Sequence, residues 1–146
     1  MKKILSFLLF LQLLIFVGCS SNVSLKGRVT FSDDDSPVSA GTVCFVKDSF
    51  QASGKLDANG NYVVGSLKAT DGLPVGSYNV YIADAKKQTG TKKVKQLEID
   101  GTTKEVDEPV YGMLVDSKFC DPKTSGLTIE VKGSTSFDFK VDRFKP

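Results

Sequence analysis

The sequence predicts an all-β protein whose domain is a β-sandwich of seven short strands. Apolar residues alternate with polar ones over most of the chain, and no window after the N-terminal apolar run shows the 3.6-residue period of an amphipathic helix. Runs rich in β-branched and aromatic residues are separated by clusters of Asp, Asn, Gly, Ser and Pro, which favour turns. All five prolines lie outside these runs, as strands require, because proline cannot donate a hydrogen bond to a neighbouring strand.

Four of the expected strands lie in the first half of the chain. The first alternates from Val23 to Phe31, and a cluster of Asp, Ser and Pro at residues 33–37 separates it from the second. The third is short, and an Asp-Ala-Asn-Gly turn at residues 57–60 follows it. These four strands are residues 23–31, 42–46, 51–56 and 61–64.

The other three expected strands are preceded or joined by equally clear turn residues. A segment with Gly72, Pro74 and Gly76 leads into the fifth strand, and Gly133-Ser134 joins the last two. The last two strands each carry apolar residues at every second position. These strands are residues 78–82, 127–131 and 137–141.

Residues 83–113 give the weakest pattern. Five lysines between Lys86 and Lys95 make its first half basic, and five acidic residues between Glu98 and Glu108 make its second half acidic. Asp100-Gly101 is a strong hairpin-turn signal, so residues 94–99 and 102–106 are expected to form a hairpin. Residues 84–92 are expected to be a mobile loop.

The first 18 residues have the layout of a secretory signal. A basic Met-Lys-Lys start precedes an apolar run at residues 4–17, which is shorter than the roughly 20 residues that a spanning helix needs. Gly18-Cys19 at its end resembles a bacterial lipobox, although Phe16 stands where such a motif usually has leucine. The resemblance implies cleavage after Gly18 and lipidation of Cys19, whereas plain secretion is the alternative. The expected organisation is then a signal peptide (1–18), an acylated cysteine with a short tether (19–23) and one domain (24–146).

Charge and composition exclude several functions. Lys2 and Lys3 leave with the signal, so the 19 basic and 17 acidic residues of the full chain become 17 and 17. A neutral chain argues against nucleic-acid binding. Histidine is absent, which excludes Ser-His-Asp and Cys-His catalysis and any zinc site that contains histidine. No catalytic, cofactor-binding or metal site is therefore expected, and no cofactor.

Three motifs in order resemble carboxypeptidase regulatory-like domains. Residues 57–62 are similar to their D-x-x-G-x-[FY] turn, and residues 73–80 to their L-P-x-G-x-Y-x-V strand entry. Residues 25–29 with 37–43 resemble their G-x-V…P-V-x-x-A-x-V start, and residues 118–139 are similar to the close of small bacterial surface lipoproteins with this domain. The resemblance implies a transthyretin-like (prealbumin-like) Greek-key sandwich that serves as an accessory or structural module. It also implies that Gly76 lets the chain turn into a strand and that Tyr78 buries its ring while its hydroxyl finds a partner.

Several residues have both a functional and a structural interpretation. Cys44 and Cys120 remain after Cys19 is modified, and outside the cytoplasm they could form a disulfide or stay separate thiols. Asp33, Asp34 and Asp35, or Asp57 with Asn59, could hold Ca²⁺ but are more typical of solvated turns. Glu105, Asp107 and Glu108 are expected at a solvated edge rather than in an active site. The Lys86–Lys95 cluster could contact anionic lipid, or it could be a solvated loop that keeps a strand edge from pairing.

The sequence favours a non-catalytic, membrane-anchored module of the cell envelope with a structural or scaffolding role. The alternative is a ligand-binding module for polysaccharide or an envelope protein, using loops at residues 47–53, 66–75 and 107–125. An enzyme like the transthyretin-like hydroxyisourate hydrolases is disfavoured because those depend on histidines. The expected partner is the lipid bilayer, through acylated Cys19, and Ser20 after it favours the outer membrane.

Overall fold

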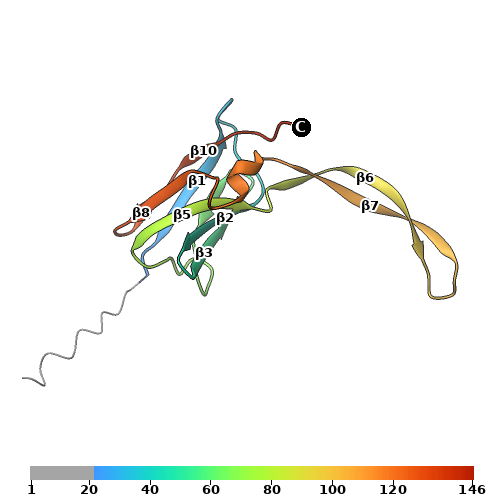
Figure 1. The fold of residues 1–146 in the computed structure, drawn as a ribbon, viewed down its shortest axis with the longest axis horizontal. Coiled ribbons are helices and arrows are strands. Elements are labelled where there is room, and N and C mark those ends of the chain that lie inside the picture. Colours follow the sequence, from blue (N-terminus) through green and yellow to red (C-terminus); the bar gives the residue numbers. More distant parts are fainter. Residues whose placement is uncertain (1–21) are drawn as a thin grey trace, which may run out of the picture.

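A computed structural model of the chain describes residues 22–146. The expected signal peptide, Cys19 and most of its tether lie outside the described residues. The protein is all-β, with two sheets stacked as a sandwich and a long two-stranded hairpin that extends away from it (Figure 1). One short 3₁₀ helix, η2 (Ser117–Cys120), lies beside β5. Within residues 22–146, no helix is long and apolar enough to cross a bilayer.

The first sheet is built around β1 (Leu25–Phe31). On one side β1 pairs in antiparallel fashion with β4 (Asn61–Val63). On the other side it pairs in parallel with β9 (Thr135–Ser136) and β10 (Phe139–Val141), so the C-terminal strands lie beside the N-terminal one.

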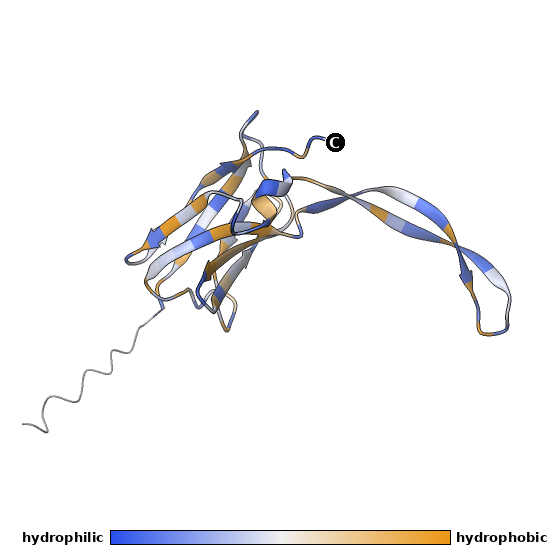
Figure 2. Ribbon diagram, viewed as in Figure 1, coloured by the Kyte–Doolittle hydropathy of each residue, from blue (hydrophilic) through white to orange (hydrophobic). Residues whose placement is uncertain are grey.

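The second sheet has the order β3-β2-β5-β8 and is antiparallel throughout. Its strands are β2 (Thr42–Lys47), β3 (Phe50–Lys55), β5 (Gly76–Ala83) and β8 (Leu127–Val131). Apolar side chains of the two sheets pack together in one core. Figure 2 shows hydrophobic and hydrophilic residues alternating along the strands. Phe45 of the second sheet meets Tyr62 of the first, with 6.0 Å between ring centroids.

The motif residues have structural roles in this sandwich. The Asp57 carboxylate accepts hydrogen bonds from the backbone N–H groups of Asn59 and Asn61, at 2.8 Å each, and so holds the turn before β4. Gly76 has a φ of 151°, which L side chains rarely adopt, where the chain enters β5. The Tyr78 ring is buried and its hydroxyl donates to the Pro74 carbonyl at 2.8 Å. The roles expected for Gly76 and Tyr78 are confirmed.

All seven stretches expected to be strands coincide with strands of the sandwich. The two sheets nevertheless hold eight strands, because β9 and β10 are separate and both pair with β1. The count of seven and the Greek-key order implied by the resemblance are therefore not confirmed, whereas the all-β sandwich is.

The hairpin of β6 (Lys86–Leu97) and β7 (Thr103–Met113), called the arm below, is longer than the sequence predicted. Residues 84–92 were expected to be a mobile loop, and this prediction is wrong from Lys86 onward. The register explains the error, since Lys92 lies opposite Glu108 and Lys95 opposite Glu105. The basic half of this segment, in β6, pairs with its acidic half, in β7. Opposite charges on facing residues stabilise an antiparallel pair of strands, and a search for alternating apolar residues does not detect such a pair.

Candidate functional site

The chain enters the sandwich beside the loop of residues 65–73. Val23 and Leu73 exchange two backbone hydrogen bonds, of 2.9 and 3.1 Å. The Asn22 side chain donates to the Ser66 hydroxyl at 3.2 Å. The next residue of the loop, Leu67, is 94% exposed, which is unusual for a large apolar side chain in a well-bonded loop. Asn22, the first described residue, is thus bonded to the residue that precedes an exposed leucine.

Asp71 fixes the shape of this loop. Its carboxylate accepts hydrogen bonds from the backbone N–H groups of Ser66, Leu67 and Lys68, at 2.5, 3.1 and 3.1 Å. These hydrogen bonds lower the pKa of the Asp71 carboxyl below its usual value, and the bond from the Ser66 N–H has the largest effect. The loop therefore holds Leu67 toward solvent in a defined position.

A shallow groove of about 570 Å³ lies between the edges of β3 and β4 and the same loop. Lys55, Asp57, Asn61, Lys68 and Thr70 give it a polar lining. Tyr62 also lines the groove, but it is only 2% exposed and offers no free ring face to a sugar. If the protein binds a ligand through the loop at residues 66–75, this groove is where the ligand would lie.

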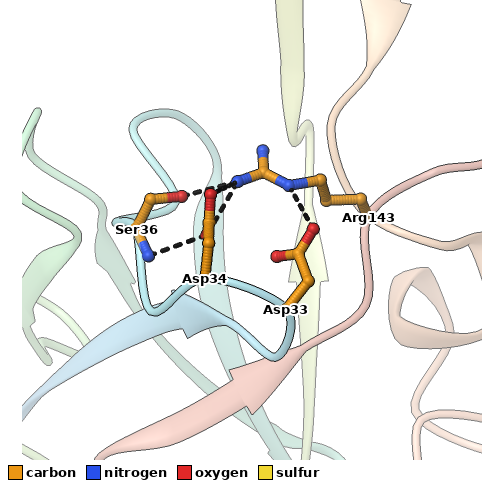
Figure 3. Close-up of polar contacts among 4 residues, drawn as sticks. All are labelled: Asp33, Asp34, Ser36 and Arg143. Atoms are coloured by element: carbon orange, nitrogen blue, oxygen red, sulfur yellow. Dashed lines mark hydrogen bonds and ion pairs between the residues drawn. The ribbon is translucent and has the colours of Figure 1, made fainter.

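Arg143 ties the C-terminal segment to the turn after β1 (Figure 3). Its Nε donates to Asp33 at 2.8 Å, and its Nη2 donates to Asp34 at 2.8 Å and to the Ser36 hydroxyl at 2.6 Å. The guanidinium carbon lies 3.8 Å from the centre of the Phe31 ring. Hydrogen bonds from Ser36, together with the Arg143 charge, lower the pKa of Asp34 from 3.8 to about 2.

Asp33, Asp34 and Asp35, for which the sequence favoured a solvated turn over a calcium site, form ion pairs at the turn after β1. The Arg143 guanidinium forms ion pairs with Asp33 and Asp34, and the Lys140 ammonium lies 2.5 Å from the Asp35 carboxylate. Among residues 22–146, no three acidic or cysteine side chains are placed to hold one metal ion together. Asp57 and Asn59 lie in the turn before β4 and bond to each other there.

The acidic residues Glu105, Asp107 and Glu108 lie on the arm, exposed, as the sequence predicted. Glu108 pairs with Lys92 at 3.0 Å and Glu105 with Lys93 at 3.7 Å. At such exposure each ion pair contributes on the order of 0.2–1 kcal/mol. Glu105 and Glu108 thereby support the arm's register.

The structure does not contain the disulfide that Cys44 and Cys120 could form, because both are free thiols. Cys44 is buried on β2 and Cys120 packs at the end of η2 against the core, each as a small apolar side chain. Burial raises the pKa of both thiols above the usual value. Because the thiolate is the reactive form, neither cysteine is suited to nucleophilic chemistry.

Sequence reasoning found Cys44, Cys120 and the acidic clusters but did not connect them to their partners. Arg143 lies 109 residues from Asp34 in the chain, and no periodic pattern links the two. Leu67 was also missed, because a single leucine in a loop is not distinguishable from a buried one without the fold. The signal for the arm was available, in the mirrored charges on either side of Asp100-Gly101.

No protein-family model matches the chain, and no curated protein matches it. Among solved structures, a DUF3823 family protein from Bacteroides uniformis is 14% identical with a TM-score of 0.41, over 84% of this chain and 44% of that one. The major pilin subunit of Bacillus cereus, BcpA, is 11% identical with a TM-score of 0.38, over 85% and 31%. A 9R-lipoxygenase from Cyanothece is 12% identical with a TM-score of 0.35, over 82% and 16%.

The chain thus spans less than half the length of each of these proteins. At these identities and TM-scores, nothing of what those proteins do carries over to this chain.

Proposed function

We propose that this protein is a non-catalytic, lipid-anchored β-sandwich module of the bacterial cell envelope, similar to carboxypeptidase regulatory-like domains, with a structural or scaffolding role. The sandwich would sit close to the membrane and hold the arm away from it. The observation that carries this proposal is the opposite placement of two features, the entry of the chain and the root of the arm. The lipobox-like Gly18-Cys19 supplies the anchor.

The entry of the chain would lie at the membrane. Three peptide units join Cys19 to Asn22, and at about 3.5 Å per residue they span roughly 10 Å. A lipid on Cys19 would therefore bring the 65–73 loop to the bilayer surface, because Asn22 is bonded to Ser66. Leu67 in this loop is 94% exposed and Val75, two residues after Leu73, is 48% exposed, and Lys68 follows Leu67 in the chain. Such a combination suits a membrane interface.

The arm begins at the other end of the sandwich. β5 starts at Gly76, three residues after Leu73, and runs for eight residues before the chain enters β6. At about 3.3 Å per residue, this strand is roughly 25 Å long and the twelve residues of β6 extend about 40 Å further. Figure 1 shows the arm leaving the sandwich far from the point where the chain enters. An anchored molecule would present the arm to other components of the envelope.

The chemistry of the described residues supports a non-catalytic role. The chain has no histidine, and both described thiols have raised pKa values. Five of the acidic residues named above, Asp33, Asp34, Asp35, Glu105 and Glu108, are paired with lysine or arginine. The ligand-binding alternative would use the groove between β3 and β4, with a protein segment fitting it better than a polysaccharide because its one tyrosine is covered.

Metabolic labelling tests the anchor directly. The full chain expressed in a lipoprotein-processing bacterium should incorporate labelled palmitate and sediment with the membranes, and the outer-membrane fraction is expected to hold it. Cys19→Ser should lose the label, while Cys120→Ser, a matched loss of a thiol, should keep it and still sediment with the membranes. An unaltered chain that incorporates no labelled palmitate would refute the lipid anchor.

A further inference from the structure

The arm exposes both edges of a two-stranded sheet. Val94 is the one residue of β6 that is partly buried, and the others are exposed. Among the described residues, β6 and β7 pair only with each other, so each has a row of unpaired backbone groups along its outer edge. A lone two-stranded hairpin is at best marginally stable in water. An arm of this length therefore offers two edges at which a further strand would stabilise it.

The two edges carry opposite charges. β6 has five lysines and no acidic residue, whereas β7 has three acidic residues and one lysine. The lysines are Lys86, Lys87, Lys92, Lys93 and Lys95, and the acidic residues are Glu105, Asp107 and Glu108.

The register shows which backbone groups are free. The Glu98 N–H donates to the Thr102 carbonyl at 2.8 Å, so Glu98 and Thr102 are a hydrogen-bonded pair. Hydrogen-bonded and non-bonded pairs alternate along an antiparallel ladder. Lys95 with Glu105 and Lys93 with Asp107 are therefore non-bonded pairs, whose N–H and C=O groups point outward to the free edges.

Pro109 agrees with this assignment. It lies opposite Thr91, which also falls on a non-bonded position, so the N–H that proline lacks would have pointed outward. The proline costs the arm no internal hydrogen bond. A further strand beside β7 could not receive a hydrogen bond from Pro109. The segment of the β7 edge that can pair without a missing hydrogen bond is therefore residues 103–108.

We propose that the arms of neighbouring copies pair edge to edge, with β6 of one copy against β7 of the next. Pairing of like edges would set lysines against lysines or carboxylates against carboxylates, which destabilises a ladder. Pairing of unlike edges in the arm's own register places Lys93 opposite Asp107 of the second copy and Lys95 opposite Glu105 of the second copy. Each of these lysines then has a carboxylate on both sides.

The pairing is open-ended. A copy that has used its β6 edge still presents its β7 edge, so a third copy can add, and the contact is heterologous rather than two-fold symmetric. If all copies are anchored in one membrane, their arms point the same way and β6 runs antiparallel to the neighbouring β7. That orientation rests on the proposed function, whereas the choice of unlike edges rests on the arm alone.

Cross-linking between two differently tagged, full-length variants tests the pairing. Lys93→Cys and Asp107→Cys are co-expressed, and mild oxidation is applied to intact membranes, or to the soluble fraction if the protein is found there. A hydrogen-bonded pair places two Cα atoms about 5.5 Å apart, within reach of a disulfide. A mixed dimer carrying both tags is expected. Each variant expressed alone should give no more dimer than the unaltered chain, whose native thiols set the background.

A second pair of variants keeps the test specific to the edge. Lys95→Pro removes an outward N–H without breaking a bond inside the arm, and Lys95→Ala removes the same charge but keeps that N–H. In the Lys93→Cys chain, Lys95→Pro should lower the mixed cross-link about tenfold, and Lys95→Ala clearly less. Equal dimer yields from single variants, cross-links only to other proteins, or no effect of Lys95→Pro would overturn the proposal. The position of the protein in the membrane or soluble fraction reports separately on the anchor.

Discussion

Tyr62 joins three parts of the sandwich. Its hydroxyl donates to the Phe137 carbonyl at 2.6 Å, and its ring lies between Phe45 and Phe139, at centroid distances of 6.0 and 6.4 Å. The side chain is 2% exposed, and burial raises the pKa of its phenol well above 10.0. One residue of β4 thereby bonds across the first sheet and packs against the second.

Removal of this hydroxyl should measurably destabilise the domain. Tyr62→Phe keeps the ring but leaves the Phe137 carbonyl without its donor, so the free energy of unfolding should fall by about 1 kcal/mol. Tyr111→Phe, on the exposed arm, is the matched control and should change it little. Urea denaturation of the three proteins measures both values. Equal stabilities would show that the bond contributes nothing.

Asp34 makes stability depend on acid pH. Its pKa is 3.8 in the unfolded chain and about 2 in the folded one, mainly through hydrogen bonds from Ser36. A lowered folded-state pKa gives a stabilising contribution that is present above 3.8 and is lost as the pH falls toward 2. Ser36→Ala should weaken this dependence, because it removes the largest cause of the shift. The melting temperatures of the unaltered protein and of Ser36→Ala should differ above pH 3.8 and converge as the pH falls toward 2. Curves that stay parallel over this range would contradict the assignment.

At the scale of residues, local chemistry was predictable and distant pairing was not. The family resemblance implied the roles of Gly76 and Tyr78, and both roles are local, since Gly76 has a positive φ at the start of β5 and Tyr78 bonds to Pro74, four residues away. Arg143 and its aspartates are separated by more than a hundred residues, and only the parallel pairing of β10 with β1 brings them together. A count of cysteines likewise indicates nothing about where Cys44 and Cys120 point.

At the scale of elements, the alternation of apolar residues located every strand that buries one face. It failed for the arm, because a ribbon exposed on both faces has no reason to alternate apolar and polar residues. Its strands are specified instead by the Asp100-Gly101 turn and by opposite charges across the ladder. The Asp100 carboxylate accepts from the Thr102 N–H at 2.9 Å and so closes that turn.

The arm should be the least protected part of the fold in dilute solution. Its hydrogen bonds are solvent-exposed and its ion pairs contribute little, so the inward amides of Val94 and Gln96 should exchange far faster than the buried Val43 and Phe45 amides of β2. Hydrogen–deuterium exchange followed by mass spectrometry measures the difference. If the arms pair edge to edge, protection of β6 and β7 should rise with protein concentration while that of β2 stays constant. Protection as strong as that of β2 at the lowest concentration would contradict this account of a marginal hairpin.

At the scale of the molecule, the sequence predicts an anchored sandwich but not how its parts are oriented. Strand positions do not tell which end of β5 lies near the chain's entry, and this depends on the bonds of Val23 with Leu73 and of Asn22 with Ser66. Those bonds place the loop that carries Leu67 beside Asn22 and Val23, and the arm begins after the far end of β5. This arrangement underlies the proposal that one end of the sandwich is anchored to the membrane and that the arm at the other end contacts other components of the envelope.

Depth-dependent fluorescence quenching tests that arrangement most directly. The full-length lipidated protein, labelled at Leu67→Cys or at Ile99→Cys near the arm's tip, is placed in vesicles that carry a headgroup quencher. The unaltered chain corrects for label on its native thiols. The account predicts strong quenching at position 67 and little at position 99. Equal quenching at both positions, or stronger quenching at position 99, would contradict it.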